Sequence, residues 1–129
     1  MGMELTMAKV LLVDDSDTWC NTVVAEFGKA GIVVIRARHY DEARLAAQDE
    51  DLSLVMVDML VAARAGAGFV RKLRSLPSLK NTPVLLTTTG TDHSAVHQAM
   101  GDSVDEIMSK NRSSLDGLTR RLTKLPLSA

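Results

Sequence analysis

The sequence predicts an α/β domain built around a parallel β-sheet of five strands. Five short runs rich in Val, Leu and Ile have the pattern of strands that are buried on both faces. Segments with the spacing of amphipathic helices separate these runs, so strand and helix alternate along the chain. Such alternation produces parallel strands joined by right-handed crossovers.

The first half of the chain is expected to hold three strands and two helices. Ser16 or Asp17 can cap the first helix, because their side chains accept hydrogen bonds from the free N–H groups of a first turn. Gly31 is expected to end this helix. Its apolar face consists of Cys20, Val23, Val24 and Phe27. The expected elements are strand Ala8–Val13, helix Thr18–Ala30, strand Ile32–Ala37, helix Tyr40–Gln48, a solvated turn at Asp49–Asp51 and strand Leu52–Asp58.

The second half begins with an expected loop, Met59–Ala65, and a helix at about Gly66–Leu76 that Pro77 ends. The last helix has an apolar stripe of Leu115, Leu118, Leu122 and Leu125. The remaining expected elements are a strand opened by Pro83, a helix that Thr91 or Asp92 caps and that runs to Met100, strand Val104–Met108, and the last helix, capped by Ser113 or Ser114.

Composition and length limit the class of protein. The 129 residues make one domain, expected at residues 7–129 behind a disordered leader at residues 1–6. One cysteine excludes an internal disulfide and favours a reducing compartment. No apolar run approaches the ~20 residues that span a membrane, so we expect a cytoplasmic protein without a membrane partner.

Charges are divided unevenly between the two halves of the chain. Residues 1–60 hold 11 acidic and 5 basic side chains, whereas residues 61–129 hold 5 acidic and 10 basic ones. The basic residues are spread over several expected helices and lack the interleaved aromatic residues of single-strand binders. We therefore expect no nucleic-acid partner.

Polar side chains follow four of the predicted strands. They are Asp14 and Asp15 after the first strand, Asp58 at the end of the third, Thr88 at the end of the fourth and Lys110 after the fifth. The common small α/β fold is the flavodoxin-like, doubly wound order 2-1-3-4-5, in which ligands bind where strands 1 and 3 are neighbours. This order brings the five side chains to one edge of the sheet.

The clustered side chains favour phosphate chemistry. Three adjacent carboxylates repel each other, so a proton, an ammonium group or a metal ion must neutralise them. Carboxylate oxygens suit Mg²⁺, which commonly binds one or two protein carboxylates together with phosphate oxygens. A carboxylate can also attack phosphorus to form an acyl phosphate. The Lys110 ammonium and the Thr88 hydroxyl would then hold the phosphoryl oxygens.

Four motifs, in this order and spacing, carry a resemblance to a known family. They are Val10–Ser16, Leu54–Asp58, Pro83–Thr88 and Asp105–Lys110. With them the chain resembles a response-regulator receiver domain of the single-domain chemotaxis type, over nearly all of Lys9–Leu125.

The resemblance implies a role for each clustered residue. Asp58 would accept phosphate from a sensor histidine kinase or a phosphotransfer protein, with Thr88 as the switch hydroxyl and Lys110 as the cation that pairs with phosphate. The implied Mg²⁺ ligands are Asp14, Asp15, Asp58 and the Leu60 backbone carbonyl. Such a protein phosphorylates itself rather than acting as an enzyme on another substrate. It would signal through contact with a downstream protein, as a monomer or weak dimer.

Four positions depart from the family pattern. Ala62 and Asn111 stand where the family usually has Pro, so the familiar cis bond after Lys110 is not expected. Thr89 replaces a usual Ala, and Ile107 replaces the usual aromatic switch residue. We expect phosphorylation to be retained and the coupling from hydroxyl to aromatic side chain to be altered.

Two other functions remain open. A phosphorylation-independent interaction module would keep the pocket and lose the relay, and normal partner binding by an Asp58→Asn protein would identify it. A haloacid-dehalogenase-like phosphohydrolase is the other, because Asp15–Asp17 imitates the paired aspartates of that class. Trp19, where that pattern has Thr or Val, and the short chain argue against it. Turnover of a phosphomonoester would identify the hydrolase.

Overall fold

The computed structural model describes residues 8–48, 51–66, 68–90 and 104–124. Within these ranges five parallel strands form one sheet in the order 2-1-3-4-5, which confirms the predicted flavodoxin-like fold. The strand bounds differ from the expected ones by one or two residues. Across the sheet the strands are β2 (Val33–Ala37), β1 (Lys9–Val13), β3 (Leu54–Asp58), β4 (Val84–Thr88) and β5 (Glu106–Ser109).

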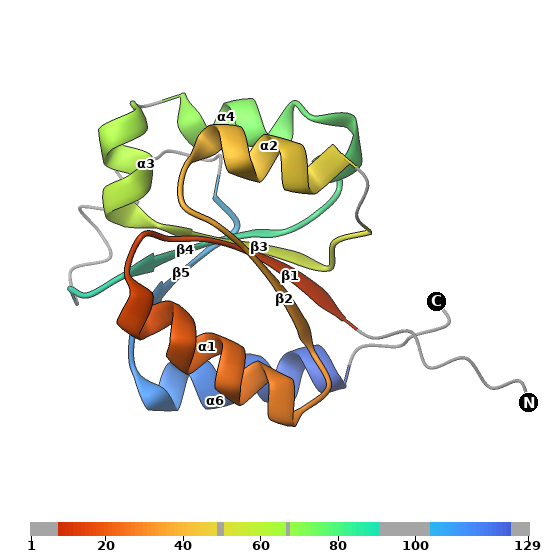
Figure 1. Cartoon of the computed structure of the whole chain (residues 1–129), viewed down its shortest axis with the longest axis vertical. Coiled ribbons are helices and arrows are strands. Elements are labelled where there is room, and N and C mark those ends of the chain that lie inside the picture. The colour runs from red at the N-terminus through yellow and green to blue at the C-terminus, as the bar shows by residue number, and fades with distance from the viewer. Residues whose placement is uncertain (1–7, 49–50, 67, 91–103, 125–129) are drawn as a thin grey trace, which may run out of the picture.

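Helices cover both faces of the sheet (Figure 1). One face carries α1 (Asp17–Lys29) and α6 (Arg112–Thr123). The other face carries α2 (Tyr40–Gln48), α3 (Met59–Ala65), α4 (Phe69–Arg74) and the short 3-10 helix η1 (Pro77–Leu79). The sheet is therefore the middle of three layers, as doubly wound α/β folds require.

Each side of the sheet has its own apolar core. Leu11 and Val13 of β1 pack on the side of α2 and α4, whereas Val10 and Leu12 pack on the side of α1 and α6. All four side chains are completely buried. Burial on both faces explains why the apolar run of β1 shows no polar alternation.

Met59–Ala65 forms helix α3, so the prediction of a loop there was wrong. The segment contains three alanines and neither Gly nor Pro, a composition that favours a helix. Asp58 caps it, because its side chain accepts hydrogen bonds from the backbone N–H groups of Leu60 and Val61. Gly66 ends α3 in a conformation with φ of 105°, which glycine adopts at little cost.

Helix α4 is shorter than the helix predicted at Gly66–Leu76. It begins at Phe69, after Gly68, and ends at Arg74. Glycine is unfavourable inside a helix, so α4 begins only after the second one. Pro77 opens η1, where its missing N–H is tolerated in the first turn.

The helix caps confirm some predictions and correct another. Ser16, one of the two predicted residues, caps α1, and Gly31 follows that helix with φ of 78°. Helix α6 is capped by Asn111, so the prediction of Ser113 or Ser114 was wrong. The Asn111 side chain accepts a hydrogen bond from the Ser114 N–H at 2.8 Å. Asn is as favourable as Ser at this position and comes earlier in the chain.

The apolar face of α1 is narrower than predicted, whereas the described part of the α6 face agrees with the prediction. Val24 was expected to be buried but is 47% exposed. The residues that α1 does bury are Cys20, Val23 and Phe27. Those that α6 buries are Leu115, Leu118 and Leu122, as predicted, whereas Leu125 lies outside the described residues.

Three other expectations also lie outside the described residues. They are the leader at residues 1–6, the helix from Thr91 or Asp92 to Met100, and the first two residues of the turn Asp49–Asp51. Among the helices that the structure describes, none combines the length and apolar character needed to cross a bilayer.

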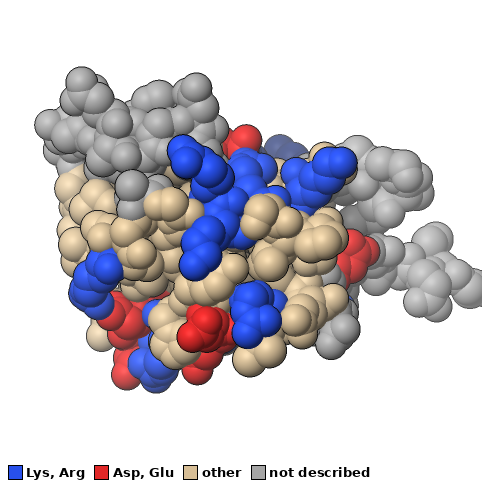
Figure 2. All heavy atoms as spheres, turned by 90° about the horizontal axis from the view of Figure 1, so that it is seen from above, with Lys and Arg blue, Asp and Glu red and all other residues tan. Residues whose placement is uncertain are grey.

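Basic side chains gather on the face of the protein formed by α2 and α4 (Figure 2). Arg71, Lys72 and Arg74 occupy the last turn of α4, where cations suit the helix dipole. Two of them are engaged within the protein, because the Lys72 ammonium lies 4.6 Å from the centre of the Tyr40 ring and Arg74 pairs with Asp105. These contacts give Lys72 and Arg74 a structural role.

Candidate phosphoacceptor site

The carboxyl ends of β1 and β3 bring the three predicted aspartates together. One carboxylate oxygen from each of Asp14, Asp15 and Asp58 lies within 4.8 Å of the other two. Asp14 is completely buried and Asp58 is 4% exposed, whereas Asp15 is exposed. Only one of the three carboxylates is therefore open to solvent.

Lys110 neutralises the two buried carboxylates. Its Nζ lies 2.8 Å from Asp14 Oδ2 and 2.8 Å from Asp58 Oδ1. The Lys110 backbone N–H donates to the Thr88 carbonyl at 2.8 Å, which fixes the lysine beside the end of β4. Burial opposes the charged ammonium, but the hydrogen bonds to the two aspartates outweigh it and raise the pKa of Lys110.

Both the side chain and the backbone carbonyl of Asp14 accept hydrogen bonds. Its Oδ1 accepts a hydrogen bond from the Ser16 N–H at 2.9 Å. Its backbone carbonyl accepts two hydrogen bonds, at 3.3 Å each, from the Arg36 guanidinium. Its buried Oδ2 accepts no hydrogen bond within the described part of the chain beyond the ion pair with Lys110. One buried lone-pair-bearing oxygen thus remains available to a ligand.

The two oxygens of Asp58 have different roles. Oδ2 accepts hydrogen bonds from the N–H groups of Leu60 at 3.0 Å and Val61 at 3.1 Å, and so caps α3. Oδ1 pairs with Lys110 and carries no backbone hydrogen bond that the structure describes. Oδ1 is therefore the Asp58 oxygen that the Lys110 ammonium contacts, whereas the helix cap takes up Oδ2.

Asp15 pairs with an arginine that the sequence reasoning missed. Arg64 Nη1, from the last turn of α3, lies 2.7 Å from Asp15 Oδ2. The hydrogen bond from Arg64 lowers the pKa of the Asp15 carboxyl. Because Met59–Ala65 was expected to be a loop, the direction of the Arg64 side chain could not be predicted. The helical composition of that segment was the signal that could have located it.

Thr88 lies at the carboxyl end of β4, between β3 and β5, and is 3% exposed. Its hydroxyl accepts a hydrogen bond from the Gly90 N–H at 3.1 Å. The neighbouring Thr87 donates instead to the Val57 carbonyl at 3.3 Å. The register pairs Asp58 with Thr87, and Thr88 with Ser109, one residue before Lys110.

Trp19 lies against the lysine of the site. Its ring centre is 5.8 Å from the Lys110 ammonium, within the range of a cation–π contact. Its Nε1 is buried without a hydrogen-bond partner among the described residues. The contact of Trp19 with Lys110 depends on how β5 and α1 meet and could not be predicted from the sequence.

The donor set fits a divalent hard cation. The site offers carboxylate oxygens and no soft ligand from the three clustered residues, as Mg²⁺ prefers. Lys110 and Arg64 supply two positive charges against three negative ones. A negative charge therefore remains at the site. A buried nucleophilic oxygen, a buried ammonium and a hydroxyl on the flank suit phosphoryl transfer.

The fold and the site together fit a signalling domain that accepts phosphate on a carboxylate. The family model for the response regulator receiver domain matches residues 10–122, and the chain belongs to this family. The chain thus carries a receiver domain of two-component signal transduction.

Relatives and solved structures agree with this assignment. The chain is 28% identical over 102 residues to the regulatory protein VanRB of Enterococcus faecalis, covering 79% of this chain and 45% of VanRB. It is 25% identical over 114 residues to protein PilH of Pseudomonas aeruginosa, covering 88% and 86%. The structure is similar to that of the Vibrio cholerae chemotaxis protein CheY4, with 30% identity, a TM-score of 0.74, and coverage of 91% and 99%.

Proposed function

We propose that this protein accepts a phosphoryl group on Asp58 from phosphohistidine of a sensor histidine kinase or phosphotransfer protein, in the cytoplasm. The observation that carries the proposal is the bridge from Lys110 to both Asp14 and Asp58, at 2.8 Å each. A buried ammonium held against a buried carboxylate is the arrangement that an incoming phosphoryl group needs. Downstream signalling then occurs through contact with another protein, by a monomer or weak dimer.

Asp58 Oδ1 is the nucleophile in this proposal. It attacks phosphorus, an O–P bond forms as the P–N bond of phosphohistidine breaks, and the imidazole leaves. Lys110 then exchanges its carboxylate contact at Asp58 for a phosphoryl oxygen, and the Thr88 hydroxyl donates to another. Asp58 Oδ2 stays bonded to the first turn of α3, which holds the carboxylate in one orientation.

Three carboxylates and one backbone carbonyl form the proposed set of metal ligands for this reaction. Asp14, Asp15 and Asp58, with the Leu60 backbone carbonyl, would hold Mg²⁺. When bound, the ion supplies positive charge that neutralises the carboxylates and the phosphoryl oxygens. Two observations support this set of ligands: the close grouping of the three carboxylates, and the buried Asp14 Oδ2, whose contact among the described residues is the ion pair with Lys110.

Intact mass spectrometry tests the proposal. The protein is incubated with a small acyl phosphate, with Mg²⁺ or with EDTA, beside an Asp58→Asn variant that keeps the cap of α3. We expect one phosphoryl group on the parent protein in Mg²⁺ only, and none on the variant. Steady turnover of a phosphomonoester would instead identify a hydrolase. No uptake, together with partner binding that survives Asp58→Asn, would identify a passive interaction module.

A further inference from the structure

Arg64 contacts the one exposed carboxylate of the site. Its guanidinium lies 2.7 Å from Asp15 Oδ2, with 64% of the Arg64 side chain and 40% of the Asp15 side chain exposed. The two buried carboxylates share Lys110 instead. Asp15 is thus the carboxylate that a cation from solvent meets first, and an arginine already occupies it.

The position of Arg64 follows from the geometry of α3. Side chains of a helix tilt toward its N-terminus. The N-terminus of α3 is capped by Asp58, so this tilt directs the side chain of Arg64 back toward the site. Because Asp58 fixes the start of the helix, the contact between Arg64 and Asp15 depends on the same residue that is proposed to accept phosphate.

Arg64 and a metal ion compete for the Asp15 carboxylate. The guanidinium takes up Oδ2 through its hydrogen bond and neutralises negative charge that would otherwise attract a cation. The pair is exposed, and exposed ion pairs are weak, so a divalent cation can displace the guanidinium. Displacement still has a cost, because Arg64 brings a positive charge close to the incoming ion.

We propose that Arg64 is an internal competitor for the metal site, which occupies Asp15 in the metal-free protein and thereby weakens binding of Mg²⁺. This inference rests on the proposed function, since it takes the three aspartates as the metal site. Arg64 acts through Asp15 and is a positioning residue. It raises the concentration of Mg²⁺ at which the site becomes competent for phosphorylation.

Titration calorimetry with MgCl₂ tests this proposal on the parent protein and on Arg64→Gln and Arg64→Lys. We expect Arg64→Gln to lower the Kd for Mg²⁺ by about threefold to tenfold, the range expected from loss of one exposed ion pair and its charge. Arg64→Lys keeps the charge without the planar fork and should lie between the two. Raising the ionic strength should reduce the differences in Kd between the three proteins, because salt screens exposed charges.

Arg121→Gln is the matched control. Arg121 forms an exposed ion pair with Glu106 at 3.0 Å, and its side chain is 56% exposed, close to the 64% of Arg64. The substitution Arg121→Gln also removes one positive charge, but near Glu106 at the start of β5, whereas the site lies at the end of that strand. The Kd for Mg²⁺ should therefore stay within about twofold of the parent value. An equal effect of both substitutions would contradict a specific role for Arg64.

The outcomes separate this inference from the proposed function. Equal Kd values for the parent and Arg64→Gln, with binding clearly measurable, would overturn the inference and leave the phosphoacceptor role intact. Absence of Mg²⁺ binding from every variant would overturn both. Circular dichroism of Arg64→Gln should show an unchanged spectrum, so that altered affinity is not a consequence of a lost α3.

Discussion

The residues beside Asp58 and Thr88 determine how long a phosphoryl group would remain on this protein. Hydrolysis of an aspartyl phosphate requires a water molecule in line with the P–O bond. Leu60 and Gly90, two residues after Asp58 and Thr88, offer no side-chain hydrogen bond to such a water. The Leu60 side chain is 51% exposed and presents apolar surface at the start of α3. We therefore expect slow loss of phosphate.

The double variant Leu60→Asn/Gly90→Glu should lose phosphate about tenfold to a hundredfold faster, because a positioned polar group aligns water. A side chain at position 90 is accommodated, since a Cβ there would meet Thr88 Oγ1 at 3.7 Å, an ordinary contact. The measurement is the first-order decay of the phosphorylated protein. Leu45→Asn, at a residue that is 58% exposed on α2, is the control and should decay like the parent. Unchanged decay in the double variant would show that water positioning does not limit the rate.

Cys20 gives stability a dependence on alkaline pH. Burial raises the pKa of its thiol to about 11, with a further contribution from Asp14. The unfolded thiol ionises near 9.0, so between about pH 9 and 11 the unfolded state loses a proton that the folded state keeps. Stability should therefore fall as pH rises through this window, by about 2 kcal/mol from Cys20. Urea unfolding at several pH values checks this, and Cys20→Ala should show a shallower decline. An identical decline in both would assign the effect to other groups.

At the scale of elements, two of the helices that begin at the site, α3 and α6, are capped by residues of the site or next to it. Asn111 follows Lys110 directly and caps α6, and Asp58 caps α3. The first cap is thus the neighbour of the site lysine, and the second is itself the proposed phosphoacceptor. Helix geometry and site chemistry are therefore coupled in this protein.

Replacing Asn111 by Ala should destabilise the protein by about 1 kcal/mol, because the Ser114 N–H loses its acceptor at 2.8 Å. For a domain of this size the melting temperature should fall by about 3–6 °C. Thermal unfolding by circular dichroism measures this. Asn111→Ser keeps a capping oxygen and should restore most of the loss. Equal destabilisation by Ala and Ser would mean that the side chain acts through something other than the cap.

The sequence was sufficient to predict the sheet and the clustered charges. Parallel strands end at one edge, so Asp14, Asp58 and Lys110 had to meet once the strand order was known. It was insufficient for the pair of Arg64 and Asp15, because that contact requires α3 to be a helix, with Asp58 as its cap. The N-cap of α6 was also missed, because Asn111 was considered only as the residue that stands where the family usually has Pro.

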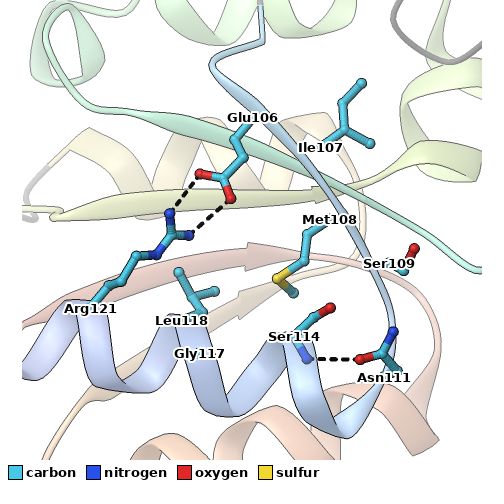
Figure 3. Close-up of a pocket in the computed structure, with 9 residues that line it drawn as sticks. All are labelled: Glu106, Ile107, Met108, Ser109, Asn111, Ser114, Gly117, Leu118 and Arg121. Atoms are coloured by element: carbon cyan, nitrogen blue, oxygen red, sulfur yellow. Dashed lines mark hydrogen bonds and ion pairs between the residues drawn. The ribbon is translucent and has the colours of Figure 1, made fainter. Parts of the chain in front are cut away.

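At the scale of the whole molecule, the question is where a change at Asp58 is transmitted. Ile107 is half-buried against the core on the side of α2 and α4, and its side chain points away from α6 (Figure 3). A branched aliphatic side chain cannot make the inward and outward swing of a Tyr or Phe. A groove lies between β5 and α6 (Figure 3). Two hydrogen bonds of 3.0 Å from Arg121 to Glu106 join the helix to the strand at one end of this groove, and the Asn111 cap fixes the start of α6 at the other.

Phosphorylation should therefore change amide exchange most in α3 and at Gly90–Asp92, which follow β4. Asp58 Oδ2 bonds two N–H groups of α3, so a change at this carboxyl alters that helix first. Hydrogen–deuterium exchange on the phosphorylated protein, compared with Asp58→Asn under the same conditions, measures it. Changes confined to β5 and α6 would contradict this route and indicate a relay through Ile107.

The most direct test of the central claim is to locate the phosphoryl group. Borohydride reduces an aspartyl phosphate to homoserine, so reduction of the phosphorylated protein followed by peptide mapping marks the acceptor. We predict homoserine at Asp58 alone, formed only when Mg²⁺ was present during phosphorylation. A mark at Asp14 or Asp15, or phosphate uptake that persists in Asp58→Asn, would contradict the account.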